Sequence, residues 1–269
     1  MILPPYAYLR HHSDLLQLPY FDFLASLGIL IPLHPGGFES TSRLVNLLRI
    51  RKEDAILEIG CGTGYSTAML CKSGAHVTVV EKSLRMLAST LFNCSKLAVP
   101  RPQIILGEAE QLLEKIGATR YDVALMECVL GFLDGQSALN ALRAALSRNG
   151  RVGLIDICYK EAPPQHLLSA LNNIVGVPIP MRSSAEVLNL FQTSEFRCEF
   201  FEESGLQQLA DIDFAQVDDA LCATGFKSHF PEVNAHFVEQ VRNRWQACAE
   251  VFQAIRPYQM LITGLWIRA

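Results

Sequence analysis

The chain has 269 residues, half of them hydrophobic and 19% charged, with a formal net charge of −4. This composition predicts a sizeable buried core and argues against a disordered chain. No block of basic residues is present, so nucleic acid is not the expected partner.

Membrane and secretion signals are also missing from the sequence. The longest apolar runs, 21–33 and 260–267, are shorter than the roughly 20 residues that a membrane helix needs. The first residues lack the basic region and cleavage site of a signal peptide. The eight cysteines contain no C-x-x-C pair and are expected to be free thiols. We therefore expect a cytoplasmic protein without a membrane partner.

Residues 1–50 are predicted to form an N-terminal helical lid segment, because they are too few for a domain of their own. Prolines interrupt their short apolar helical patterns. Ser40 or Thr41 is expected to cap a helix that runs to about Leu48. We expect this segment to pack over a sheet or over the ligand of the sheet.

Residues 51–160 alternate between apolar strands and helices and are predicted to form the cofactor-binding core. Strands are predicted at 55–59, 75–80, 103–106, 122–126 and 151–158, and helices at 65–73, 84–97, 109–116 and 137–147. The last of these helices is expected to end at Asn149-Gly150, a helix C-terminal signal. Strands that alternate with helices imply right-handed crossovers and a parallel sheet.

Residues 161–269 are predicted to supply the remainder of the sheet, with helical cap segments inserted. Helices are predicted at 163–174 and 183–191, and strands at 196–201 and 260–267. Residues 202–230 are the least regular part, and Pro231 is expected in the first turn of a long helix. The predicted fold class is α/β, with a doubly wound, mostly parallel seven-stranded sheet and a helical cap.

A glycine loop follows the first predicted strand and reads G-x-G-x-G through Gly60, Gly62 and Gly64. Glycines let the backbone turn sharply and approach a ligand closely. A dinucleotide site usually reads G-x-G-x-x-G, whereas here Tyr65 occupies the place of the third glycine. Glu81 ends the second predicted strand, where a carboxylate accepts hydrogen bonds from the ribose hydroxyls of a nucleotide cofactor.

The stretch Glu58-Ile59-Gly60-Cys61-Gly62-Thr63-Gly64 resembles motif I of the class I S-adenosylmethionine-dependent methyltransferases. Three later stretches continue the resemblance: Gly107-Glu108-Ala109, Tyr121 to Met126 (motif IV), and Leu146 to Arg151. The resemblance implies the Rossmann-like methyltransferase fold and S-adenosylmethionine as cofactor. It implies these cofactor-binding residues: Glu58, Gly60, Cys61, Gly62, Gly64, Glu81, Lys82, Glu108, Ala109 and Glu127.

The stretch from Cys128 to Asp156 resembles the small-molecule branch that contains arsenite methyltransferases and ubiquinone or menaquinone C-methyltransferases. In the arsenite enzymes a cysteine at the position of Cys128 binds the metalloid, and a second cysteine stands where this chain has Asn173. A soft trivalent metalloid needs two or three thiolates. Cys128 is therefore read either as an acceptor-site residue or as a small buried residue under the cofactor.

Methyl transfer from a sulfonium requires orientation of the acceptor, and a general base only when the acceptor must lose a proton. The catalytic candidates are Cys128, Tyr159 just past the fifth predicted strand, and His34 in the loop His34-Pro35-Gly36-Gly37. Each has a structural alternative, namely core packing for the first two and a tight turn for His34. The histidines show no metal-ligand spacing, and no metal site is expected.

The leading hypothesis is methyl transfer to a small, partly apolar acceptor. Aromatic residues of the cap suggest an apolar pocket, although most are expected in the core: Phe191, Phe226, Phe230, Phe237 and Trp245. One alternative is a non-catalytic S-adenosylmethionine-binding or partner-binding protein on the same fold. A nicotinamide-dependent oxidoreductase is the other, and the glycine spacing disfavours it. No oligomeric state follows from the sequence.

Overall fold

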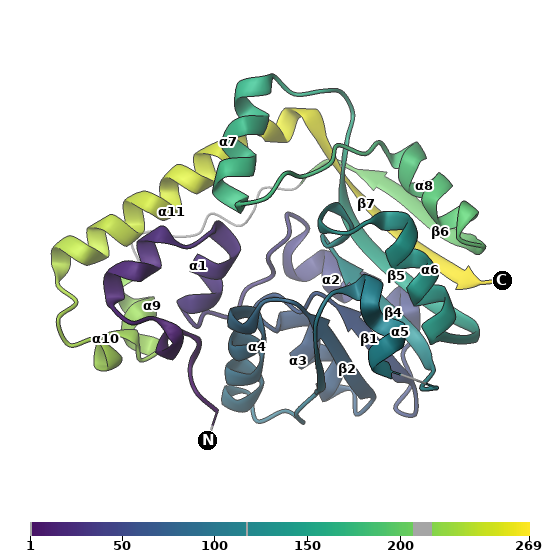
Figure 1. Ribbon diagram of the computed structural model, residues 1–269, viewed down its shortest axis with the longest axis horizontal. Helices are drawn as coiled ribbons and strands as arrows, with labels where there is room; N and C mark the ends of the chain where they lie inside the picture. Colours follow the sequence, from purple (N-terminus) through teal and green to yellow (C-terminus); the bar gives the residue numbers. More distant parts are fainter. Residues whose placement is uncertain (1, 117, 207–216) are drawn as a thin grey trace.

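A sheet with the strand order β3-β2-β1-β4-β5-β7-β6 lies at the centre of the computed structural model (Figure 1), which describes residues 2–116, 118–206 and 217–269. Its strands are β1 (Ala55–Ile59), β2 (His76–Glu81), β3 (Gln103–Leu106), β4 (Tyr121–Glu127), β5 (Leu146–Tyr159), β6 (Phe196–Ser204) and β7 (Gln259–Arg268). All seven were predicted as strands.

The sheet is mostly parallel, as predicted. Strand β7 alone runs against its neighbours β5 and β6, and the other described strand pairs are parallel. The strand order reverses between β1 and β4, because the chain passes from β1 outward to β2 and β3 before it returns. Such a switch point opens a crevice at the carboxyl ends of the strands, where ligands of α/β sheets bind.

Helices cover both faces of the sheet. Three helices pack on one face, α2 (Gly37–Leu48), α3 (Tyr65–Lys72) and α4 (Leu84–Lys96). Three others pack on the opposite face, α5 (Leu112–Ile116), α6 (Gly135–Ala145) and α8 (Ser184–Thr193). The Phe191 ring of α8 stacks on Trp266 of β7 with centroids 3.9 Å apart. The sheet is therefore doubly wound and buried on both faces.

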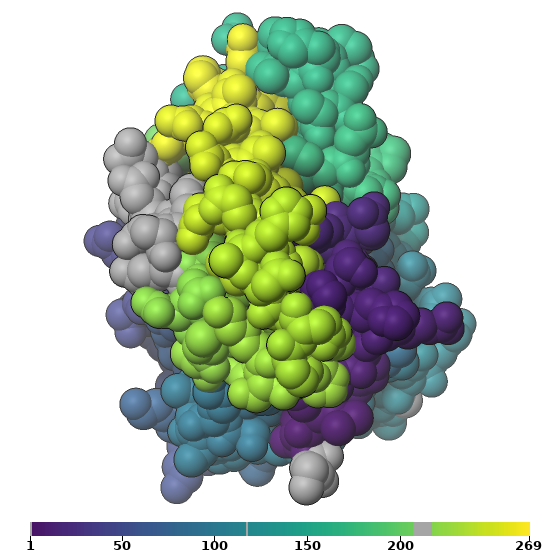
Figure 2. Space-filling view, turned by 90° about the vertical axis from the view of Figure 1, so that its left-hand side faces the viewer, coloured from purple at the N-terminus to yellow at the C-terminus, as the bar shows by residue number. Residues whose placement is uncertain are grey.

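A helical cap lies beyond the carboxyl ends of the strands and joins two distant parts of the chain. Its elements are the 3-10 turns η1 (Pro5–Tyr8) and η2 (His12–Gln17) with α1 (Tyr20–Ser26), α7 (Gln165–Val175), α9 (Val217–Ala223), α10 (Phe226–His229) and α11 (Ala235–Ile255). The Tyr6 hydroxyl donates to the Thr224 carbonyl at 2.9 Å. In Figure 2 the N-terminal segment, in purple, lies directly beside α11. Within the described ranges, no helix is long and apolar enough to cross a bilayer.

Two predicted boundaries in the first 150 residues are wrong. Helix α2 begins at Gly37, and the Thr41 side chain does not cap it because its hydroxyl donates to Glu127. Helix α6 ends at Ala145, before the predicted stop at Asn149. Strand β5 already pairs with β4 at Leu146, so the turn signal falls inside a bulge of the strand.

The start of the long cap helix was also predicted too early. Helix α11 begins at Ala235 rather than at Pro231, because the Asn234 side chain accepts the Phe237 backbone N–H at 3.0 Å and caps the helix there. The stretch 202–230, predicted as irregular, contains the end of β6 and the helices α9 and α10. Part of this stretch, 207–216, lies outside the described residues.

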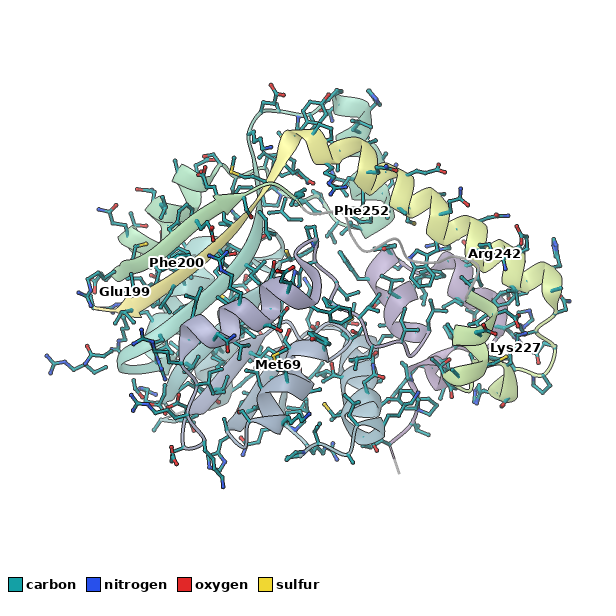
Figure 3. All side chains as sticks on the ribbon, turned by 180° about the vertical axis from the view of Figure 1, so that it is seen from behind. Met69, Glu199, Phe200, Lys227, Arg242 and Phe252 are labelled. Carbon is teal, nitrogen blue, oxygen red and sulfur yellow. The ribbon has the colours of Figure 1, made fainter. Side chains whose placement is uncertain are left out.

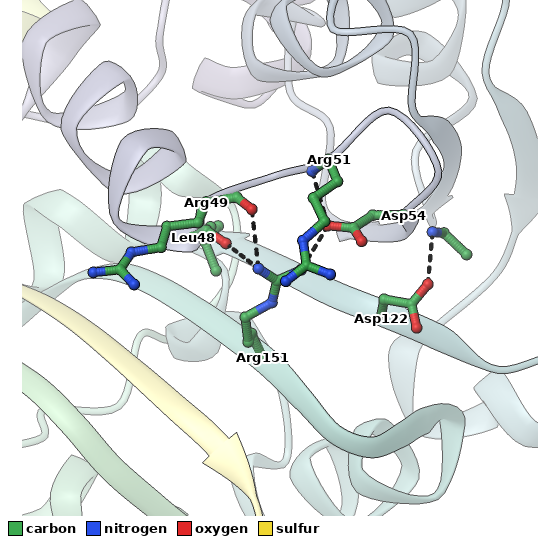
Figure 4. A network of polar contacts seen from close by, with 7 residues as sticks. Leu48, Arg49, Arg51, Asp54, Asp122 and Arg151 are labelled. Atoms are coloured by element: carbon green, nitrogen blue, oxygen red, sulfur yellow. Dashed lines mark hydrogen bonds and ion pairs between the residues drawn. The ribbon is translucent and has the colours of Figure 1, made fainter.

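Arg151 ties helix α2 to the sheet (Figure 4). Its guanidinium donates to the carbonyls of Leu48 and Arg49 at 2.6 and 3.0 Å, and to the Asp54 carboxylate at 2.5 Å. Asp54 also accepts the Arg51 backbone N–H at 3.0 Å. The last carbonyls of a helix have no partner within the helix, so this side chain satisfies them and fixes where α2 ends.

We predict that Arg151→Met lowers the free energy of unfolding by about 1.5 to 3 kcal/mol, since a charge-assisted network is lost while the aliphatic stem remains. Urea unfolding measures this. The matched control is Arg148→Met, because Arg148 is exposed on the same strand. Equal stability of the two variants would contradict the assigned role of Arg151.

Candidate functional site

A cavity of about 370 Å³ lies at the carboxyl ends of β1, β2 and β4, under the cap. The sheet side is lined by the glycine loop and by the turns that follow β2, β3 and β4. The cap side is mostly apolar and includes Phe21, Leu33, Phe132, Val175 and Val177. The cavity is therefore polar toward the sheet and apolar toward the cap.

The glycine loop has a backbone that only glycine fits. Gly60 has a φ of 76°, and a Cβ there would lie 2.3 Å from the Val129 side chain. Gly64 has a φ of 91°, and a Cβ there would lie 2.7 Å from the Thr90 backbone. Gly60 lines the cavity and makes room for the Val129 side chain of the turn after β4. Gly64 does not line the cavity. Its role is to let the loop pack closely on α4.

The chain segment between α1 and α2 is held over this loop. The Thr63 hydroxyl donates to the Ile31 carbonyl at 2.5 Å, and the Asn93 amide donates to the Ile29 and Thr63 carbonyls at 3.2 and 2.9 Å. The cap side of the cavity is thus fixed to its sheet side.

Glu81 ends β2 and lines the cavity. It accepts the Ser83 backbone N–H at 2.8 Å, and burial raises the pKa of its carboxyl, against the opposing effect of this hydrogen bond. The Ser83 hydroxyl donates to Asp22 of α1 at 2.7 Å, so the turn after β2 also contacts the cap. The carboxylate has acceptor capacity left for a pair of ligand hydroxyls.

Eight of the ten cofactor residues named from the sequence line the cavity: Gly60, Cys61, Gly62, Glu81, Lys82, Glu108, Ala109 and Glu127. Gly64 is one exception. The other is Glu58, whose side chain is buried against α3, where its carboxyl accepts the Thr67 hydroxyl at 2.5 Å. Burial raises the pKa of Glu58 well above its ordinary value. Glu58 is therefore part of the packing under the site.

Glu127 ends β4 and is the centre of a buried polar cluster. Its carboxyl accepts the Thr41 hydroxyl at 2.7 Å and the Ser66 hydroxyl, and it lies 3.4 Å from Nε2 of His34. Burial raises the pKa of Glu127, but the hydrogen bond and the electrostatic effect of His34, together with the hydrogen bonds from Ser66 and Thr41, outweigh it and hold this pKa below the ordinary value. Glu127 therefore stays ionised although its side chain is only 7% exposed.

The three catalytic candidates lie in different surroundings. His34 and Cys128 line the cavity. Burial raises the pKa of the Cys128 thiol well above its ordinary value, so this cysteine is not a thiolate. Tyr159 does not line the cavity, because it packs with Leu171 and Ile255 beneath α7.

The five aromatic residues named for the pocket lie in packed cores, as was expected for most of them, and none of them lines the cavity. Phe191 packs on the face of the sheet that α5, α6 and α8 cover. The other four aromatic residues form the interior of the cap: Phe226, Phe230, Phe237 and Trp245. Phe21 and Phe132 line the cavity instead, edge to face at 5.8 Å. The hydroxyls of Thr41 and Ser66 were also missed. Nothing in the local sequence marks these residues, which come together only through the fold.

The charges on the cavity wall are mostly negative. Acidic side chains on the wall are Asp22, Glu81, Glu108, Glu110 and Glu127, and Lys82 is the one permanent cation among the described lining residues. Nor do the described residues contain a group of three or more histidine, cysteine or acidic side chains with the geometry for a metal ion. The site favours a cationic ligand over an anionic one.

Comparisons with known proteins agree on one family of enzymes. Residues 57–152 match the family described as methyltransferase domain. The chain is 25% identical over 218 residues to "Uncharacterized methyltransferase YodH" of Bacillus subtilis, which covers 78% of this chain and 91% of that protein. It is 38% identical over 118 residues to a malonyl-(acyl-carrier protein) O-methyltransferase of Halalkalibacterium halodurans, 40% of this chain and 43% of that protein.

A solved structure has the same fold. It is the SAM-dependent methyltransferase from Geobacter sulfurreducens in complex with S-adenosyl-L-homocysteine, with a TM-score of 0.67 at 14% identity, over 94% of this chain and 99% of that one. This likeness confirms the predicted Rossmann-like arrangement of the sheet and its helices.

The raised pKa of Glu58 predicts a pH-dependent difference between the wild type and Glu58→Gln. The native state retains a proton that the unfolded chain releases near its ordinary pKa of 4.5. The unfolding free energy of the wild type therefore falls as pH rises above this value, and the variant lacks this loss. Urea unfolding at pH 5 and pH 8 should show the variant gaining stability relative to the wild type. The exposed Glu114→Gln is the control, and parallel behaviour of both variants would refute the prediction.

Proposed function

We propose that this chain, a class I S-adenosylmethionine-dependent methyltransferase, transfers the methyl group to a small, partly apolar and uncharged acceptor. The observation that carries the proposal is a single cavity with two kinds of wall. Its sheet side has the glycine loop and Glu81, and its cap side has the apolar surface of Phe21, Leu33 and Phe132. Donor and acceptor would meet between these walls, with water excluded by the cap.

The residues on the sheet side fit S-adenosylmethionine. Gly60 lets the turn after β4 pack closely on the glycine loop, because a Cβ there would overlap Val129, and Glu81 would accept the ribose hydroxyls. Glu108 would lie near the adenine, and the acidic wall suits a cation. When bound, the cofactor supplies a methyl group on a positively charged sulfur. A nicotinamide oxidoreductase is no longer an alternative, given the methyltransferase domain.

The charges of the cavity favour an acceptor without a carboxylate or phosphate group. A malonyl group, named in one relative, carries a carboxylate, and bidentate recognition of a carboxylate normally uses arginine. No arginine is among the described lining residues, and Lys82 is the one permanent cation there. The apolar wall and the lack of cations support a neutral organic molecule.

Within the small-molecule branch, the thiols of the site favour a quinone-like organic acceptor over arsenite. Only Cys61 and Cys128 contribute thiols among the described lining residues. Cys61 lies beside Glu81, with its sulfur 3.9 Å from the carboxylate, and burial raises the pKa of both thiols well above the ordinary value. A trivalent metalloid needs two or three thiolates.

Two measurements test the proposal. Calorimetry should detect binding of S-adenosylmethionine and S-adenosylhomocysteine, and no binding of NAD. A methyl-labelled donor should label members of a panel of phenols, quinols and indoles, with little labelling of carboxylates, phosphates, protein or tRNA. Donor binding without labelling of any acceptor would instead support a non-catalytic binding protein.

We predict that Glu81→Ala weakens S-adenosylmethionine binding by about 1 to 3 kcal/mol, the range of charge-assisted hydrogen bonds. Calorimetry measures the change. Glu53→Ala removes an exposed carboxylate before β1 and should leave the affinity as it was. Unchanged affinity in Glu81→Ala would remove this residue from the donor site.

We further predict that Phe132→Ala raises the KM for the acceptor by about tenfold, because an apolar wall of the acceptor side is removed, while donor affinity changes little. The control is Phe200→Ala. Phe200 is also partly exposed, but it lies on β6 at the sheet edge remote from the cap (Figure 3). An equal effect of both variants would contradict the assignment of Phe132.

A further inference from the structure

The hydrogen bonds around His34 determine which of its ring nitrogens carries a proton. The Thr41 hydroxyl has one hydrogen, and it donates this hydrogen to Glu127 at 2.7 Å. His34 Nε2 lies 3.0 Å from the same hydroxyl oxygen and 3.4 Å from the Glu127 carboxylate, and both of these partners accept. Nε2 must therefore be the donor, and in the neutral ring Nδ1 carries the lone pair.

Nδ1 of His34 is buried and has no hydrogen-bond partner. The side chain is only 4% exposed, and the residue lines the cavity together with Leu33 and Cys128. Buried polar atoms are nearly always paired, because an unpaired one costs about 1 to 3 kcal/mol. A histidine with a purely structural role would be expected to pair both nitrogens, so the unpartnered Nδ1 points to a ligand.

We propose that His34 is the general base of the methyl transfer and that Glu127 is its positioning residue; this rests on the proposed function. The acceptor then belongs to the class whose nucleophilic atom carries a dissociable proton, such as a phenol, an enol or a heterocyclic N–H. The Nε2 hydrogen bond fixes the ring, which leaves Nδ1 as the nitrogen that is free to accept the proton of an acceptor in the adjoining cavity. The Glu127 carboxylate stabilises the imidazolium that forms.

The reaction balances without any further reagent. The acceptor atom bonds to the methyl carbon while the bond from that carbon to the donor sulfur breaks, leaving its electron pair on sulfur. The acceptor proton passes to Nδ1. A sulfonium and a neutral imidazole thus become a thioether and an imidazolium, so the total charge is unchanged.

Other titratable groups surround His34 and are shared by the wild type and a variant of His34. Glu127 faces it from β4, and Asp156 of β5 interacts with it, with a pKa raised to about 6 by burial. Tyr65 of α3 and Cys128 also line the cavity. All four remain in a variant of His34 alone, so the difference between the variant and the wild type reports the histidine.

The main test compares acceptors with and without a dissociable proton. His34→Gln keeps a donor for Thr41 and Glu127 but has no base. We expect it to lower kcat for phenols by about 100-fold or more and to leave donor affinity unchanged. With thioanisole or a tertiary aromatic amine, which lose no proton, its activity should match the wild type. His166→Gln, an exposed histidine of α7, is the control.

Equal losses for both acceptor classes, or no loss for phenols, would overturn the role of base. Failure of the wild type to bind S-adenosylmethionine would instead count against the proposed function. If neither acceptor class is turned over, the nitrogen shifts of ¹⁵N-labelled histidine decide. A neutral His34 protonated on Nε2 supports the proposal, and one protonated on Nδ1 refutes it. Thr41→Val removes the hydroxyl that accepts from Nε2, so it should reduce the share of His34 that carries its proton on Nε2. A folded Thr41→Val protein with this change would show that the hydroxyl sets the protonated nitrogen.

Discussion

The buried carboxylate of Glu127 is the constraint on which the site depends. A carboxylate out of water is costly unless several donors surround it. Here the donors come from three other parts of the chain: His34 before α2, Thr41 within α2, and Ser66 in α3. To keep the Glu127 carboxylate ionised, the chain must bring all three donor side chains against the end of β4. The N-terminal segment is thereby held over the crevice of the sheet, where it completes one wall of the cavity.

The two walls of the cavity differ in polarity, so they suit different ligand groups. The sheet side offers backbone close to the ligand and several carboxylates, which suits a cationic donor. The cap side offers aromatic and aliphatic surface, and His34 lies among its lining residues. Under the proposed function, the sheet side would hold the donor and the cap side would hold the acceptor.

Sequence patterns predicted the strands, the glycine loop and Glu81, because each depends on local spacing. Glu58 was named with the cofactor residues, but its side chain meets α3, because side chains alternate along a strand and its neighbours Leu57 and Ile59 take the other face. The apolar wall could not be predicted, since Phe21 and Phe132 meet only after the fold has formed. The role of Thr41 was hidden in the same way: its hydroxyl was expected at a helix cap, and it serves a strand elsewhere in the chain.

The contact between η1 and α9 has a consequence for how the protein is made. The hydrogen bond from Tyr6 to Thr224 joins residues 218 positions apart, and α11 follows later still. During synthesis from the N-terminus, the sheet side of the cavity can assemble while the cap still lacks half of its helices. The interior of the cap is therefore complete only once the last third of the chain has left the ribosome, so a truncated product would keep the sheet side of the cavity under a cap that lacks α9, α10 and α11.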